Sequence, residues 1–107
     1  MFTRVVECTI KPGKSQEFIT TFHDDVLPIL QKQTGFVDET LLASHSNQNE
    51  FLAVSYWKNQ DDAERYRHDT YPEISELLRP VLVSDPRVRT FTVQHSLTHK
   101  ISAAKAA

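Results

Sequence analysis

The segment FLAVSYW, at residues 51–57, constrains the fold of this chain more than any other part of its sequence. In an extended strand its side chains divide between two faces, with Phe51, Ala53 and Trp57 on one and Leu52, Val54 and Tyr56 on the other. Both faces are apolar, whereas a strand at a solvated face alternates apolar with polar residues. The pattern therefore predicts a central strand that is covered on both sides.

Three other segments are typical of strands because they are rich in β-branched and aromatic residues between turn signals: 2–10, 36–46 and 88–96. In the first, the side chains divide into an apolar face, with Val6, Cys8 and Ile10, and a polar face, with Thr3, Glu7 and Thr9. The polar turn NQNE at 47–50 joins 36–46 to 51–57, which predicts a β-hairpin.

Helical spacing follows the first predicted strand. Phe18, Phe22 and Val26 recur at steps of four residues, and Ser15 is expected to cap the start of this helix. Pro28 lies inside the pattern and has no N–H to donate, so we expect it to kink the helix or to end it early.

The ends of the helices carry further signals. Gly35 is placed to end the first helix in a left-handed conformation. Asn59 is expected to cap a second helix. After an interruption, Thr70 and Glu73 are expected to form a capping box that opens another helical segment.

The predicted order of elements is β-α-β-β-α-β. This order indicates an α+β, ferredoxin-like fold, in which a four-stranded antiparallel sheet has its helices on one face. We expect one domain at 1–99 and a flexible C-terminal tail at 100–107. The chain offers no spare element to cover the second face of the sheet, so we expect a homodimer that packs sheet to sheet.

Composition excludes several classes of partner. The net charge is −2, which argues against nucleic acid and anionic membranes, and no segment is apolar enough to span a bilayer. The single cysteine, Cys8, has no partner for an intrachain disulfide, so we expect a cytoplasmic protein. His95 and His99 are spaced like metal ligands on a helix, but they lie at a strand end without a third ligand, so we expect no metal.

Two stretches carry a family resemblance. GFVDETLL (35–42) and FLAVSYWKNQDDAERY (51–66) resemble the antibiotic biosynthesis monooxygenase (ABM) family of the dimeric α+β-barrel group, and VLPILQKQTGF (26–36) resembles the end of its first helix. The resemblance implies a small dimer with a cavity between sheet and helices in each subunit. Members of this family include oxygenases of aromatic polyketides and quinols that use neither metal nor flavin, and haem-degrading enzymes are similar.

Three positions depart from those subfamilies. Where the haem-degrading enzymes carry a histidine on the second helix, this chain has Glu76, and its first strand lacks their asparagine. Ala53 stands where the polyketide oxygenases have an asparagine before the tryptophan. We therefore expect no haem and no other cofactor.

Oxygenation without a cofactor requires a substrate anion that can reduce O₂ itself, held in a dry pocket beside a base. The candidates for binding such a small aromatic molecule are Trp57, Tyr66, Tyr71 and Phe22. The candidate catalytic bases are His68 and His23. Simpler explanations exist for these residues. Trp57 is more typical of a core, and Tyr66 and Tyr71 are equally typical of half-buried helix positions. Both histidines have acidic neighbours that are typical of a solvated face.

The leading hypothesis is a cofactor-independent monooxygenase acting on a small aromatic or quinol-type substrate. The alternative is a dimeric module that binds a hydrophobic metabolite without turnover. A third interpretation is a structural dimerisation domain whose cavity is filled by its own side chains.

Overall fold

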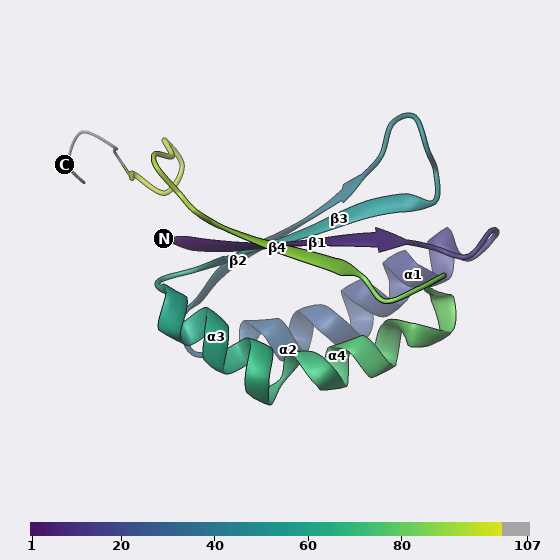
Figure 1. Cartoon of the computed structure of the whole chain (residues 1–107), viewed down its shortest axis with the longest axis horizontal. Helices are drawn as coiled ribbons and strands as arrows, with labels where there is room; N and C mark the ends of the chain where they lie inside the picture. The colour runs from purple at the N-terminus through teal and green to yellow at the C-terminus, as the bar shows by residue number, and fades with distance from the viewer. Residues whose placement is uncertain (102–107) are drawn as a thin grey trace.

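The computed structural model describes residues 1–101, which form an antiparallel sheet with helices on one face (Figure 1). The strands are β1 (Phe2–Thr9), β2 (Phe36–Ala43), β3 (Glu50–Trp57) and β4 (Arg87–Thr92). The helical elements are α1 (Ser15–Thr21), η1 (Phe22–Val26), α2 (Leu27–Gln31), α3 (Gln60–Asp69), α4 (Tyr71–Leu78) and η2 (Arg79–Val81). In the described part of the chain, no helix is long and apolar enough to cross a membrane.

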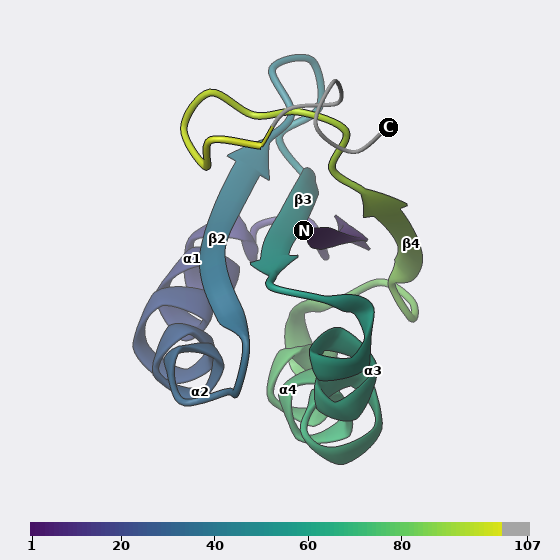
Figure 2. The same ribbon diagram turned by 90° about the vertical axis from the view of Figure 1, so that its left-hand side faces the viewer.

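The strand order is β2-β3-β1-β4, with every neighbouring pair antiparallel. This order confirms the predicted ferredoxin-like fold and places β3 inside the sheet. Figure 2 shows the helices as one layer of two arms, formed by α1 with α2 and by α3 with α4. Both helical arms lie on the same side of the sheet, so the opposite face of β3 has no helix over it.

The core fills the space between the sheet and the helices. Its buried members come from β1, β3 and both arms, and partly buried residues of β2 pack against them. The largest side chains with almost no exposure are Trp57, Arg4, Phe18, Ile10 and Val26. Four of these five are hydrophobic, as expected for a core. Arg4 is the exception.

The outer face of the sheet carries apolar side chains that are only partly covered. Val54 of β3 is buried, whereas Leu52 of the same strand and Leu42 of β2 are exposed. The chain does supply some cover, contrary to the expectation that it has no spare element. After β4 it returns over this face, where the rings of Tyr56 and His99 lie 5.3 Å apart (Figure 2).

This return explains why the last strand is shorter than predicted. The N–H of Val93 still donates to the carbonyl of Met1, at 2.9 Å. Ser96 and Ile101 instead pair with each other through two backbone hydrogen bonds. The predicted tail at 100–107 therefore begins with paired residues, and its residues 102–107 lie outside the described part of the chain.

Pro28 does not end the first helix early. A π-helical turn, η1, immediately precedes α2, where Pro28 occupies the first turn. A wider turn accommodates the missing N–H of proline. The expected cap at Ser15 was wrong: Ser15 is the first helical residue, and its hydroxyl donates to the carbonyl of Gln48 at 2.9 Å.

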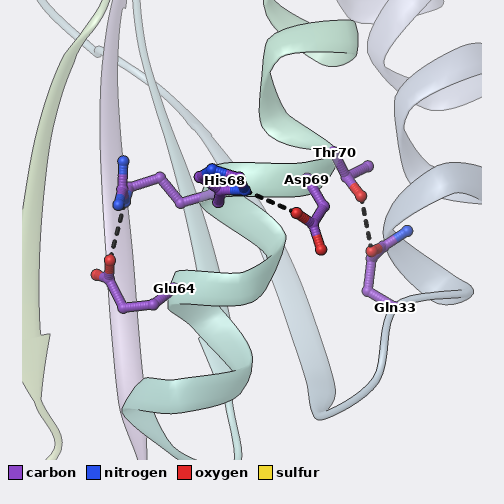
Figure 3. Close-up of polar contacts among 6 residues, drawn as sticks. Gln33, Glu64, His68, Asp69 and Thr70 are labelled. Atoms are coloured by element: carbon purple, nitrogen blue, oxygen red, sulfur yellow. Dashed lines mark hydrogen bonds and ion pairs between the residues drawn. The ribbon is translucent and has the colours of Figure 1, made fainter.

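The second arm contains one confirmed cap and one error. Asn59 accepts a hydrogen bond from the Asp62 N–H at 2.9 Å, which confirms it as the cap of α3. The capping box at Thr70 and Glu73 is absent, because the Thr70 hydroxyl donates instead to the side chain of Gln33 at 3.0 Å (Figure 3). This bond joins the α3–α4 junction to the segment that follows α2.

Gly35 has the left-handed conformation that its position predicts, with a φ of 81°. A methyl group at this position would overlap the carboxylate and Cβ of Asp62, whose own backbone is held by Asn59. Gly13 also has a positive φ, of 77°, but open space surrounds its Cα.

The Gly35→Ala substitution is therefore expected to destabilise the protein by about 2–4 kcal/mol, since left-handed strain and overlap add. Gly13→Ala carries the strain alone and is expected to cost about 1 kcal/mol. Urea unfolding followed by fluorescence measures both. Equal losses of stability in the two variants would show that Asp62 can move away from the added methyl group at no energetic cost.

Candidate functional site

A cavity of about 30 Å³ lies between the sheet and the helices. Its polar and aromatic lining consists of Arg4, Glu39, Ser55, Phe22, Tyr66 and Tyr71. Aliphatic side chains and Cys8 complete the wall. A volume of this size holds about one water molecule, so a larger ligand requires the wall to move.

Three polar side chains form a row across the sheet. Ser55 of β3 is the register partner of Arg4 on β1 and of Glu39 on β2, so the three residues are at one level and on one face. All three line the cavity. The two ionisable residues are therefore held on opposite sides of Ser55 by the strand register.

Arg4 is only 2% exposed. Its guanidinium carbon lies 4.8 Å from the centre of the Tyr71 ring and 5.5 Å from that of Tyr66, which is cation–π geometry. Burial lowers the pKa of Arg4, although the two tyrosines oppose this change. Its Nε–H has no hydrogen-bond partner among the described residues. Arginine stays protonated in proteins, so the cavity holds a full positive charge.

Glu39 does not neutralise this charge. Burial raises the pKa of its carboxyl to about 9, and neighbouring Asp38 adds to the shift, while the backbone of Val54 partly opposes it. At neutral pH the carboxyl is thus protonated. Its Oε1 is buried without a hydrogen-bond partner among residues 1–101.

Tyr66 and Tyr71 form the aromatic wall. Their ring centres lie 6.1 Å apart, edge to face. Burial raises the pKa of both hydroxyls, so both remain neutral donors. Trp57 does not line the cavity: its ring stacks behind Tyr66 at 4.7 Å, and its N–H donates to Ser55 Oγ at 2.9 Å. The indole therefore holds two lining residues in place.

The two histidines lie outside the cavity. The His68 side chain is 80% exposed on α3, with Nδ1 2.8 Å from the carboxylate of Asp69 (Figure 3). His23 is 77% exposed and pairs in the same way with Asp24, at 2.9 Å. Of the residues predicted from sequence, the structure thus gathers Tyr66, Tyr71 and Phe22 around the cavity, places Trp57 behind them and leaves both histidines outside the cavity.

A second hollow, of about 170 Å³, opens beside the first. Its wall includes His23 and Leu27, and it shares Phe22 and Glu39 with the inner cavity. Phe22 is the first residue of the π-helical turn. These two side chains therefore separate the inner cavity from a hollow nearer the surface.

A larger hollow, of about 360 Å³, lies elsewhere, at the end of the sheet beside the β2–β3 hairpin. It lies against Leu42 and Leu52, which belong to the exposed outer face. We regard the inner cavity as the candidate site because only there do buried ionisable and aromatic groups converge.

Cys8 lines the inner cavity as a neutral thiol, since burial raises its pKa to about 11. Within residues 1–101, no three His, Cys, Asp or Glu side chains gather as a set of metal ligands.

Sequence analysis did not identify Arg4 or Glu39. Both residues are in phase with an apolar face, Arg4 with Val6 and Cys8 on β1, and Glu39 with Leu41 on β2. A charged residue at an inward-facing position is a signal for a site, because burying a charge without a function is costly.

The comparisons with known proteins agree with this architecture. The family model described as antibiotic biosynthesis monooxygenase matches residues 1–71. The chain belongs to the antibiotic biosynthesis monooxygenase family. The matched ABM region contains β1 to α3 and so includes Arg4, Glu39 and Tyr66.

Solved structures share the ABM fold over nearly the whole chain. SnoaB, a cofactor-independent oxygenase from Streptomyces nogalater, superposes with a TM-score of 0.76 at 24% identity, covering 90% of this chain and 95% of SnoaB. A monooxygenase from the gene ActVA-Orf6 of Streptomyces coelicolor, solved with the ligand Nanaomycin D, gives a TM-score of 0.75 at 18% identity and covers 90% and 89% of the two chains.

A curated relative has a different name. "Putative heme-binding protein rrnAC3100" of Haloarcula marismortui is 32% identical over 80 residues, which is 74% of this chain. The match covers 12% of the length of that relative, so the ABM chain corresponds to about an eighth of it.

The raised pKa of Glu39 predicts how stability depends on pH. The folded state holds a proton on Glu39 up to about pH 9, whereas the unfolded carboxyl releases it near its ordinary value of 4.5. Between these values the free energy of unfolding falls as pH rises, by up to about 1.4 kcal/mol per pH unit.

We expect Glu39→Gln to remove this slope, and Glu76→Gln, at an exposed carboxyl, to keep it. Urea unfolding at several pH values between 5 and 9 measures the effect. Parallel pH profiles for the wild type and Glu39→Gln would contradict the burial of a protonated Glu39.

Proposed function

We propose that this ABM protein is a cofactor-independent monooxygenase that oxidises a small aromatic or quinol-type molecule. The supporting observation is the enclosure of Arg4, Glu39, Tyr66 and Tyr71 around one cavity beneath the sheet. Such a combination of aromatic walls with largely buried ionisable groups suits chemistry on an aromatic anion. Membership of a family with cofactor-independent oxygenases of the same fold supports the assignment.

The overall reaction balances without an external reductant. A quinol with a free ring position and one O₂ give a hydroxyquinone and one H₂O. The substrate loses both hydroxyl protons and its ring hydrogen, and it supplies the four electrons that reduce O₂. One oxygen atom forms the new C–O bond, and the other leaves as water. Removal of the first proton makes the substrate electron-rich enough to react.

We propose that the Glu39 carboxylate accepts this proton from the substrate. It lines the inner cavity, whereas His68 lies on the surface of α3 and His23 lines only the neighbouring hollow of about 170 Å³. Only the ionised fraction of Glu39, about one molecule in a hundred at pH 7 for a pKa of about 9, can accept this proton. That pKa is close to the value of about 10 for a phenol such as tyrosine, so transfer to the ionised carboxylate costs little. The neutral hydroxyls of Tyr66 and Tyr71 can donate hydrogen bonds to substrate oxygens.

Substrate access requires a rearrangement, since the inner cavity has only about 30 Å³. Phe22 lies between it and the outer hollow of about 170 Å³. π-helical turns are frequent at functional sites. We propose that Phe22 moves aside within η1 and joins the two hollows.

The name of the Haloarcula relative raises haem as a second ligand, but the lining does not fit it. Protein ligands of haem iron are histidine, cysteinate, methionine or tyrosinate. No histidine or methionine lines the cavity, and burial keeps Cys8, Tyr66 and Tyr71 protonated. Glu76, which stands where haem-degrading enzymes carry a histidine, is exposed on α4. Haem is therefore not part of the proposal.

Oxygen uptake with 1,4-dihydroxynaphthalene tests the function. We expect uptake above the spontaneous rate, and a loss of at least about 100-fold in kcat for Glu39→Gln, as is typical when an acid–base group is removed. Glu76→Gln makes the same chemical change on the surface and is expected to leave uptake unchanged.

The His68→Ala variant separates the two proton acceptors. Loss of uptake in this variant, with retention in Glu39→Gln, would assign the proton to histidine instead. Binding of the quinol without any uptake above background would support the alternative, a dimeric module that binds a hydrophobic metabolite. A Soret band after addition of haem would overturn the rejection of haem.

The homodimer is a separate part of the proposal. Leu42, Leu52 and Phe91 leave apolar area exposed on the outer face of the sheet, which is the face without helices. Leu42 and Leu52 are cross-strand neighbours on this face, and exposed apolar patches mark interfaces. We propose that a second copy covers this face, as the family resemblance implies.

Leu52→Glu is expected to yield a monomer, because it places a charge in the centre of that interface. Leu77 is the matched control, since it is 38% exposed on α4 whereas Leu52 is 37% exposed on the sheet. Leu77→Glu is expected to remain dimeric. Light scattering after gel filtration measures the mass, and a monomeric wild-type protein would refute the interface.

A further inference from the structure

We propose that Arg4 makes the inner cavity selective for aromatic molecules that carry an anionic oxygen, either a phenolate or a carboxylate. The guanidinium would be the direct partner of that oxygen. The inference rests on the proposed function in one respect only, that the inner cavity admits a small aromatic molecule.

Arg4 has hydrogen-bond donors that the protein itself does not satisfy. A guanidinium presents five N–H donors in its own plane. The rings of Tyr66 and Tyr71, at 5.5 and 4.8 Å, account for attraction to its π-faces but accept none of these in-plane bonds. Nε–H, on a side chain that is 2% exposed, has no partner among the described residues. A buried donor left unpaired is costly, so a ligand acceptor would remove that cost.

The positive charge of Arg4 has no balancing negative group in the cavity wall. The other ionisable groups in the wall are Glu39, Cys8, Tyr66 and Tyr71, and burial favours the neutral form of each of them. Among the described residues, no carboxylate forms an ion pair with Arg4. Glu64 attracts it electrostatically, but that carboxylate is bonded at 2.9 Å to Arg67 on the surface of α3 (Figure 3). The cavity therefore has one uncompensated positive charge.

Arg4 also lies beside other groups that can bind an anionic oxygen. Arg4, Ser55 and Glu39 are neighbours in one cross-strand row, so an oxygen held by Arg4 lies beside a hydroxyl and near a neutral carboxylic acid. All of these groups can donate to an anion, whereas a cationic ligand would meet only repulsion from Arg4. The tyrosine rings provide the apolar surface for the rest of an aromatic molecule.

A structural role is the competing explanation of Arg4. Stacking on Tyr71 gives the residue a place in the core without any ligand. That explanation accounts for the contacts of the guanidinium with the rings but leaves its in-plane N–H donors and its charge without partners. If Arg4 had only this structural role, its replacement by an apolar residue would leave the stability of the protein unchanged or increase it. The two explanations therefore differ in what ligand binding shows.

Three probes of similar size test the inference: 4-nitrophenol at a pH at which it is ionised, 4-nitrobenzoate and neutral nitrobenzene. Nitroaromatic compounds quench indole fluorescence, and the only tryptophan of the chain stacks directly behind Tyr66. Quenching of Trp57, checked by calorimetry, therefore gives the three dissociation constants. We expect at least one anion to bind about 10- to 100-fold more tightly than nitrobenzene.

Variants assign the preference to Arg4. Arg4→Met is expected to remove it and to leave the affinity for nitrobenzene within about 3-fold, since methionine keeps much of the volume. Arg4→Lys keeps the charge and is expected to retain part of the preference. Arg65→Met, at an exposed arginine, is expected to behave like the wild type.

Each outcome has a defined meaning. Preference for 4-nitrophenolate over 4-nitrobenzoate identifies phenolates as the class, and the reverse identifies carboxylates. Equal affinity of the wild-type protein for the anions and for nitrobenzene overturns this inference and leaves the proposed function standing. Binding of none of the probes defeats the cavity on which the proposed function depends. An anion preference that survives in folded Arg4→Met overturns the role of Arg4.

Discussion

The stacking of Trp57 on Tyr66 joins the centre of the sheet to the second helical arm. The indole is completely buried at the end of β3, and its N–H is bonded to Ser55 on the same face of that strand. Because α3 begins three residues after Trp57, the ring and the helix have little freedom relative to each other. This packing sets the position of Tyr66, and Tyr66 in turn is one of the two rings against which Arg4 lies. The geometry of the cavity therefore depends on the stacking of Trp57 on Tyr66.

Local patterns predicted the framework well. The two apolar faces of 51–57 indicated a central strand, and β3 is central. Gly35 and Asn59 have the conformations and contacts that their positions indicated, because a left-handed glycine and a helix cap depend on neighbouring backbone. Errors arose where a distant partner competed. Thr70 donates to Gln33 instead of capping its own helix, and Ser15 donates to Gln48.

The candidate site was predicted less well, for a physical reason. A prediction from the pattern of polar and apolar residues places charged side chains in the solvent. It therefore misses an arginine or glutamate that lies inside a functional site. Arg4 and Glu39 come together only through the pairing of β1 and β2 with Ser55 of β3, a register that the sequence does not reveal. The histidines, chosen because an imidazole can act as a base, lie on exposed helix surfaces.

Cys8 gives this chain a built-in reporter of internal motion. It is the only cysteine, it is almost completely buried, and its raised pKa keeps the thiolate scarce. A thiol reagent can modify it only when sheet and helices separate transiently, so the rate of alkylation counts those openings. Since Cys8 lines the same cavity as Phe22, a ligand that locks the two layers together would slow the modification without touching the sulfur.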